Sequence, residues 1–158
     1  MTATTLRSAA AQYCTFWAGG LCFGIAVEGV QEVLRYQSMT PVRRAPAAVH
    51  GLINLRGQIV TALDLRCLLG LPARDDSALP MNVIVRSRGE VVSLLVDDIG
   101  DVIDTAGLDL EPAPSNLPST VQEVVTGVLS FPETILLVLD ADRAVDVTTV
   151  PDPSGGTP

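Results

Sequence analysis

Short apolar runs, each broken by a turn signal within a few residues, are the feature that most limits how this chain can fold. Residues 13–17 and 21–25 flank a Gly-Gly pair, and residues 83–85 and 91–96 flank an Arg-Gly pair. Two such runs around a two-residue turn are typical of β-hairpins. No run approaches the roughly 20 residues that a membrane-spanning helix requires. The pattern predicts a mainly β fold built from small barrels, with no direct membrane insertion.

The rest of the chain also consists of short apolar runs separated by turn residues. Val27 to Leu34 carries valines at helical spacing, which predicts a short helical turn or a bent strand. Further strands are expected over 52–55, 59–63, 99–103, 124–129 and 135–139, and helical turns over 64–69 and 140–145. We expect one domain over residues 11–147, with a boundary between two barrel subdomains near 66–80. Flexible ends are expected over 1–10 and 148–158.

Composition removes several classes of enzyme. All ten basic residues are Arg, so a Schiff-base lysine and a phosphate-binding Walker loop are excluded. The single histidine, His50, leaves little for histidine-dependent catalysis or metal binding. The three cysteines, Cys14, Cys22 and Cys67, show no Cys-x-x-Cys pair and are interpreted as free thiols in a reducing cytosol. The N-terminus lacks the apolar core of a signal peptide. We therefore predict a cytoplasmic protein without metal or cofactor.

Charge is distributed unevenly along the chain. Residues 1–96 contain nine Arg and six acidic residues, whereas residues 97–158 contain one Arg and twelve acidic residues. A net charge of −8 argues against nucleic acid as a partner. Asp97, Asp98, Asp101 and Asp104 do not have the spacing of a calcium loop and are interpreted as a solvated strand edge. From these residues alone, we predict a non-catalytic binding module.

Residues 50–66 make the prediction more specific. They read His-Gly-Leu-Ile-Asn-Leu-Arg-Gly-Gln-Ile-Val-Thr-Ala-Leu-Asp-Leu-Arg. This segment resembles the signature of CheW-like domains, the adaptors of bacterial chemosensory arrays. The matching residues here include Gly51, Asn54, Leu55, Arg56, Gly57, Asp64 and Arg66. Val30-Gln31-Glu32-Val33 upstream and Pro112-Ala113-Pro114 downstream also match in order, and the resemblance covers about residues 12–146.

The resemblance implies a fold and a role. The fold is two small SH3-like five-stranded β-barrels around a shared core, with short helices. The role is that of a non-catalytic adaptor that couples the cytoplasmic tips of chemoreceptors to the regulatory domain of a CheA-type histidine kinase. Such an adaptor is cytoplasmic and is recruited to receptor arrays. An adaptor for a pilus-motility or second-messenger pathway fits the same residues, and a small ligand- or oligonucleotide-binding β-barrel is the rival class.

Two sites are expected within this frame. A partly buried Arg56 is expected to pair with Glu32, beside an apolar receptor-binding groove formed by Val30, Val33 and Leu55, with Gly57 at the turn. A salt bridge that only orders the core is an equally weighted alternative. Gly51, Asn54, Asp64 and Arg66 are assigned to the structural motif.

The loop around Pro112-Ala113-Pro114 is the second expected site. There, Glu111, Ser115 and Asn116 replace a basic and an aromatic residue through which family members contact the kinase. We expect this contact to be weakened or moved to a partner of reversed charge.

Overall fold

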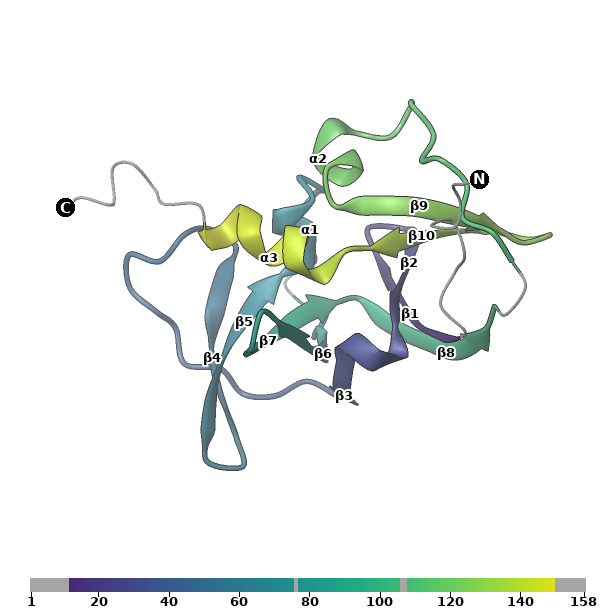
Figure 1. Ribbon diagram of the computed structural model, residues 1–158. Helices are drawn as coiled ribbons and strands as arrows, with labels where there is room; N and C mark the ends of the chain where they lie inside the picture. Colours follow the sequence, from purple (N-terminus) through teal and green to yellow (C-terminus); the bar gives the residue numbers. More distant parts are fainter. Residues whose placement is uncertain (1–11, 76, 106–107, 150–158) are drawn as a thin grey trace.

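Short segments rich in apolar, aromatic and β-branched residues form ten strands in the part of the chain that the computed structural model describes, residues 12–75, 77–105 and 108–149. The strands make two five-stranded sheets (Figure 1). Sheet A has the order β8-β1-β2-β10-β9 and contains β1 (Gln12–Ala18), β2 (Leu21–Ala26), β8 (Asp98–Asp104), β9 (Val125–Ser130) and β10 (Ile135–Leu139). Sheet B has the order β3-β6-β7-β5-β4 and contains β3 (Val30–Leu34), β4 (Val49–Leu55), β5 (Gln58–Asp64), β6 (Met81–Ser87) and β7 (Glu90–Val96). The predicted mainly β class with two five-stranded units is confirmed.

The two sheets are interleaved in sequence. The chain begins in sheet A with β1 and β2, enters sheet B after a 3₁₀ turn at Val27–Gly29, and returns to sheet A after β7. The predicted subdomain boundary near residues 66–80 is therefore wrong, because that segment connects β5 to β6 within sheet B. Turn signals marked a loop there but did not show which strands pair.

Three tight hairpins have positive φ at both central residues, as in type I′ turns. In the β1–β2 hairpin both positions are glycine, Gly19 and Gly20. The β4–β5 and β6–β7 hairpins have arginine first and glycine second: Arg56 at φ 52° and Gly57 at φ 88°, and an Arg-Gly pair at 88–89. A left-handed conformation costs a non-glycine residue about 1–2 kcal/mol. Both arginines are therefore held in place by the pairing of the strands around them.

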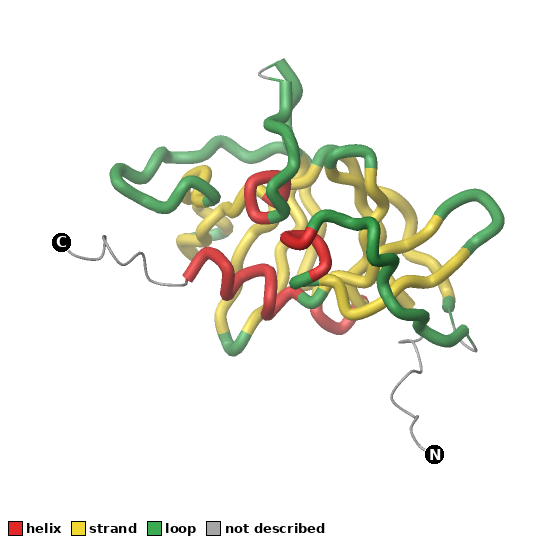
Figure 2. Tube along the Cα trace, turned by 90° about the horizontal axis from the view of Figure 1, so that it is seen from above, coloured by secondary structure: helices red, strands yellow, loops and turns green. Residues whose placement is uncertain are grey.

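The largest hydrophobic cluster lies between the two sheets. Strand residues of both sheets contribute to it, together with Leu65 and Leu68 of α1 (Leu65–Leu68), Val121 of α2 (Ser119–Gln122) and Ala144 of α3 (Ala141–Thr149). Figure 2 shows the helices gathered near the middle of the molecule, with strands on both sides. Each sheet also packs around a smaller cluster of its own, centred on Leu129 and Leu136 in sheet A and on Ile53 and Ile84 in sheet B. This arrangement is the predicted pair of units around a shared core.

The segment 27–34, expected to be a short helical turn or a bent strand, contains both. Val27–Gly29 is a 3₁₀ turn, and Val30–Leu34 is a bulged strand that pairs with β6. The last helix continues to Thr149, so the expected flexible tail does not begin at residue 148. The expected flexible segment 1–10 and residues 150–158 lie outside the described residues. The three cysteines are free. Among the described residues, the helices are too short and too polar to cross a membrane.

Candidate functional site

The β4–β5 hairpin, which projects from sheet B in Figure 1, presents Arg56 at its tip. The side chain of Asn54 accepts a hydrogen bond from the Gly57 amide at 2.8 Å and so closes the turn. Arg56 then forms an ion pair with Glu32 of β3. β3 and β4 are the two edges of sheet B, so this pair connects one edge of the sheet to the hairpin at the other.

The predicted partners Glu32 and Arg56 meet, but their expected partial burial is wrong for the arginine. The Arg56 side chain is 67% exposed and that of Glu32 is 24% exposed. The hydrogen bond from Arg56 lowers the pKa of Glu32, so the carboxylate is charged at neutral pH. Solvent screens an exposed pair, which contributes little to stability. The pair is therefore better suited to contact with a partner than to holding the core together.

The apolar residues expected beside this pair divide between surface and core. A β-bulge between Val30 and Glu32 places Val30 and Val33 opposite Val85 and Val83, which share one face of β6. Val30 packs against the cluster between the sheets, whereas Val33 is 38% exposed. Leu55 is buried within sheet B, so the expectation that it lines an open groove is wrong. Val33 is the member of the predicted groove that a partner can reach directly.

Gly51 has a steric role. A Cβ at this position would lie 2.8 Å from the carbonyl oxygen of Thr40, which is closer than such atoms approach. Thr40 and Leu52 exchange backbone hydrogen bonds of 2.8 and 2.9 Å, so the loop before β4 lies directly against this strand. Glycine allows that close approach. The residue therefore positions the loop that leads into the β4–β5 hairpin.

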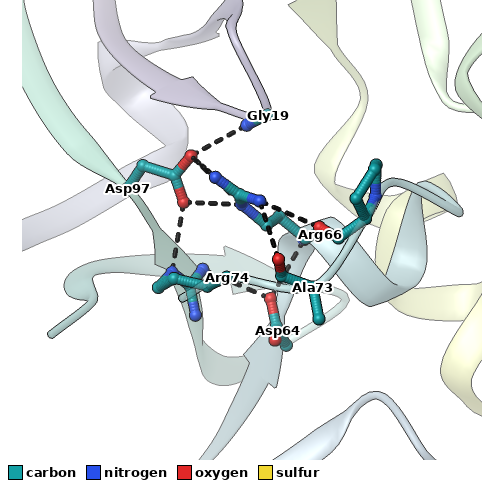
Figure 3. Close-up of polar contacts among 7 residues, drawn as sticks. Gly19, Asp64, Arg66, Ala73, Arg74 and Asp97 are labelled. Carbon is teal, nitrogen blue, oxygen red and sulfur yellow. Dashed lines mark hydrogen bonds and ion pairs between the residues drawn. The ribbon is translucent and has the colours of Figure 1, made fainter. Parts of the chain in front are cut away.

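A partly buried cluster of charged side chains lies where the two sheets join (Figure 3). Asp64 caps α1 by accepting a hydrogen bond from the Arg66 amide at 3.0 Å. The Arg66 guanidinium binds Asp97, just after β7, with a shortest distance of 2.7 Å. Arg74, on the loop between β5 and β6, binds Asp97 at 3.1 Å and Asp64 at 3.3 Å. We name Asp64, Arg66, Arg74 and Asp97 the junction cluster.

Asp97 is the centre of the junction cluster. Its carboxylate also accepts a hydrogen bond from the Gly19 amide at 2.8 Å, and its own amide donates to the Trp17 carbonyl. Burial alone raises the pKa of Asp97, but the hydrogen bonds from Arg66, Gly19 and Arg74 outweigh this effect and hold the pKa below its usual value. The same contact with Asp97 raises the pKa of Arg66. Asp97 thus connects the β1–β2 turn of sheet A to α1 and to the loop between β5 and β6 that carries Arg74.

Sequence reasoning found half of this cluster. Asp64 and Arg66, which the sequence assigns to the structural motif, both belong to the junction cluster. Asp97 was grouped with a solvated strand edge, which is wrong for this residue because three separate segments donate hydrogen bonds to it. Arg74 was missed, since a lone arginine in a proline-bounded loop has no periodicity. Its side chain is only 8% exposed.

The loop that contains Glu111, Ser115 and Asn116 lies on sheet A. Glu111 pairs through its backbone with Val128 of β9, and its carboxylate accepts a hydrogen bond from Ser130 at 3.5 Å. The side-chain amide of Gln122 in α2 donates a hydrogen bond of 3.1 Å to the Ser115 carbonyl oxygen. All three predicted residues are exposed. The structure thus places this loop and the Glu32–Arg56 pair on different sheets.

Two five-stranded sheets around a shared core, with charged and polar groups presented at their edges and loops, define a double SH3-like domain. The chain belongs to the CheW-like domain family, whose pattern matches residues 12–148. It is 26% identical to the chemotaxis protein CheW of Rhizobium meliloti, and the match covers 87% of this chain and 88% of the relative. It is 27% identical to the chemotaxis protein CheW of Bacillus subtilis, over 83% of this chain and 84% of the relative.

The fold is also that of a solved structure, the scaffolding protein TtCheW from Thermoanaerobacter tengcongensis. The TM-score is 0.74 at 22% sequence identity, and the match covers 86% of this chain and 92% of that chain. The match of the family pattern confirms the family expected from residues 50–66, and the similar fold confirms the SH3-like architecture.

Proposed function

We propose that this protein is a non-catalytic adaptor that couples the cytoplasmic tips of chemoreceptors to the regulatory domain of a CheA-type histidine kinase, in the cytoplasm at receptor arrays. The observation that carries the proposal is family membership over nearly the whole described chain. The two relatives are chemotaxis proteins, and the protein of the similar solved structure is a scaffolding protein. An adaptor needs separate surfaces for its partners, and the candidate residues lie on two different sheets.

For the receptor, the proposed surface is the exposed Glu32–Arg56 pair together with Val33. Glu32 and Val33 point to opposite faces of the edge strand β3, so a receptor helix that lies along this edge meets the ion pair on one face and the accessible valine on the other. Leu55 is buried and Val30 is partly buried against the cluster between the sheets, so both are proposed to support this surface from behind. Gly57 contributes by allowing the turn that presents Arg56.

For the kinase, the proposed surface is the loop of sheet A that contains Glu111, Ser115 and Asn116. Pairing of Glu111 with Val128, and the hydrogen bond from Gln122 to Ser115, fix the shape of this loop before any partner binds. Preorganisation lowers the entropic cost of association. An acidic residue at 111 is expected to select a kinase surface with a basic residue opposite it.

A reconstituted phosphorylation assay tests the proposal. The kinase and receptor encoded with this protein are mixed with and without it, and transfer of phosphate to the kinase is followed. Phosphorylation is expected to rise only when receptor, kinase and this protein are all present. Equal phosphorylation with and without the protein would refute the adaptor role. Turnover of any substrate by the protein alone would contradict its non-catalytic role.

Matched variants separate the two surfaces. Arg56→Glu places two carboxylates together and is expected to weaken receptor binding by at least about tenfold while kinase binding persists. Arg143→Glu on α3 makes the same charge change outside the proposed surfaces and is expected to leave both affinities unchanged. Receptor binding that is unaffected by Arg56→Glu would refute the site but not the adaptor role. The receptor recovered with the protein also distinguishes swimming chemotaxis from a pilus-motility or second-messenger pathway.

A further inference from the structure

An apolar hollow opens at one end of the face of sheet A that carries its own hydrophobic cluster. The strand register sets this face: Trp17 of β1 is opposite Cys22 of β2, which is opposite Leu136 of β10. Cross-strand partners share a face of a sheet. Cys22 and Leu136 are buried in the cluster of sheet A, whereas Trp17 is 38% exposed. The tryptophan therefore lies at the rim and the other two residues at the floor.

The hollow has a volume of about 260 Å³ and is lined by Thr15, Trp17, Cys22, Gly100, Asp101, Ile103, Phe131, Thr134 and Leu136. Its lining combines an indole, a phenyl ring and aliphatic carbon with a single carboxylate. Trp17 is the only tryptophan of the chain. Partly exposed tryptophans beside apolar pockets are enriched among residues that dominate protein–protein binding energy.

Negative charge surrounds this hollow. Asp101 lines it, Asp98 is opposite Trp17 in the register of β1 and β8, and Glu133 lies in the turn between the lining residues Phe131 and Thr134. Among the residues that the structure describes, the lining includes no arginine. The excess of acidic residues across 97–158 extends the same sign of charge. A carboxylate beside an exposed indole favours a cation above the ring, because both attract positive charge.

We propose that this hollow docks a segment of a partner protein in which an apolar side chain stands next to arginine or lysine. The apolar side chain fills the space above Cys22 and Leu136, and the cation lies over Trp17 near Asp98 and Asp101. Long basic side chains suit such a rim because their stems pack on apolar surface while their charges stay hydrated. The surface is distinct from the Glu32–Arg56 pair of sheet B, and the inference goes beyond the two contacts of the proposed function.

The lone tryptophan makes binding directly observable. The intact protein is titrated with the capped tetrapeptide Arg-Leu-Leu-Arg while Trp17 emission is recorded. We expect a saturable change in emission that weakens as salt is added, since the charges are near the surface. Glu-Leu-Leu-Glu and Arg-Ser-Ser-Arg, capped in the same way, are expected to bind at least about tenfold more weakly, because each lacks one of the two required features. No saturable change with Arg-Leu-Leu-Arg up to about 10 mM would overturn the proposal.

Variants identify the groups involved. The double variant Asp98→Asn, Asp101→Asn keeps side-chain shape and is expected to weaken binding of the basic peptide by about tenfold. Asp109→Asn removes one exposed charge outside the lining and is the matched control, expected to leave binding unchanged. Equal binding of capped Gly-Leu-Leu-Gly and Arg-Leu-Leu-Arg would refute the charged docking segment and identify a pocket for neutral apolar ligands. Loss of binding in the control variant alone would also contradict the assignment.

Discussion

Replacing Asp97 with alanine is the most direct test of the junction cluster. The change removes the common acceptor of two guanidinium groups and one backbone amide. Breaking a fully buried ion pair by removing one partner costs about 3–5 kcal/mol. The side chains of Arg66, Arg74 and Asp97 are 20%, 8% and 22% exposed, so solvent reduces the penalty, and Arg74 retains Asp64. We expect the free energy of unfolding to fall by about 2–3 kcal/mol.

Urea unfolding at neutral pH measures this loss. With a slope of about 2 kcal/mol per molar urea, the midpoint of Asp97→Ala is expected to fall by roughly 1–1.5 M. Asp98→Ala is the matched control, because it removes the neighbouring carboxylate, which is exposed and, within the described part of the chain, accepts a hydrogen bond only from the adjacent Ile99 amide. Surface changes of this kind are usually within about 0.5 kcal/mol. Equal midpoints for the two variants would refute the central role of Asp97.

Acid should remove the same stabilisation from the unmodified protein. The pKa of Asp97 is lower in the folded state than in the unfolded chain, so its contribution is complete above the unfolded pKa of about 3.9 and is lost as the pH falls through the folded value. The difference in unfolding free energy between the unmodified protein and Asp97→Ala is therefore expected to shrink steadily below about pH 4. A difference that stays constant down to pH 2, about two units below that value, would contradict the ionised role of this carboxylate.

Three further outcomes are expected from the structure. Arg56→Gly should unfold no more readily than the unmodified protein, because glycine adopts positive φ freely and the lost ion pair with Glu32 is exposed; a clear fall in melting temperature would show that the pair is structural. Gly51→Ala should cost about 1–3 kcal/mol in urea unfolding, because the new Cβ would lie 2.8 Å from a backbone oxygen; an unchanged midpoint would show that the loop gives way freely. Val30→Asp should lower the free energy of unfolding by at least about 2 kcal/mol, whereas Val33→Asp should stay within about 0.5 kcal/mol, and equal losses would refute the division between core and surface.

The hairpins and the family signature could be predicted because each depends on residues that are adjacent in the sequence. A two-residue turn that requires positive φ selects glycine, and the alternation around it identifies the strands. The segment 27–34 was less tractable. Its valines have a helical spacing, but residues 30–34 form a strand that pairs with β6. The bulge between Val30 and Glu32 places Val30 and Val33 on the same face of this strand. The hydrogen bonds of a neighbouring strand outweigh a weak local pattern.

The sequence by itself determined the class of fold, most strand positions, and the Glu32–Arg56 pairing. The tertiary structure determined which side chains are exposed and which charged residues pair with each other. Leu55 and Val33 are similar in hydrophobicity and both lie on edge strands of sheet B, yet Leu55 is buried in the smaller cluster of that sheet and Val33 is 38% exposed. Arg74 and Asp97 are 23 residues apart, and Gly19 is 78 residues from Asp97. Only the return of the chain from sheet B to sheet A brings these groups together, and their partial burial then favours pairing, because removing an unpaired charge from water costs free energy.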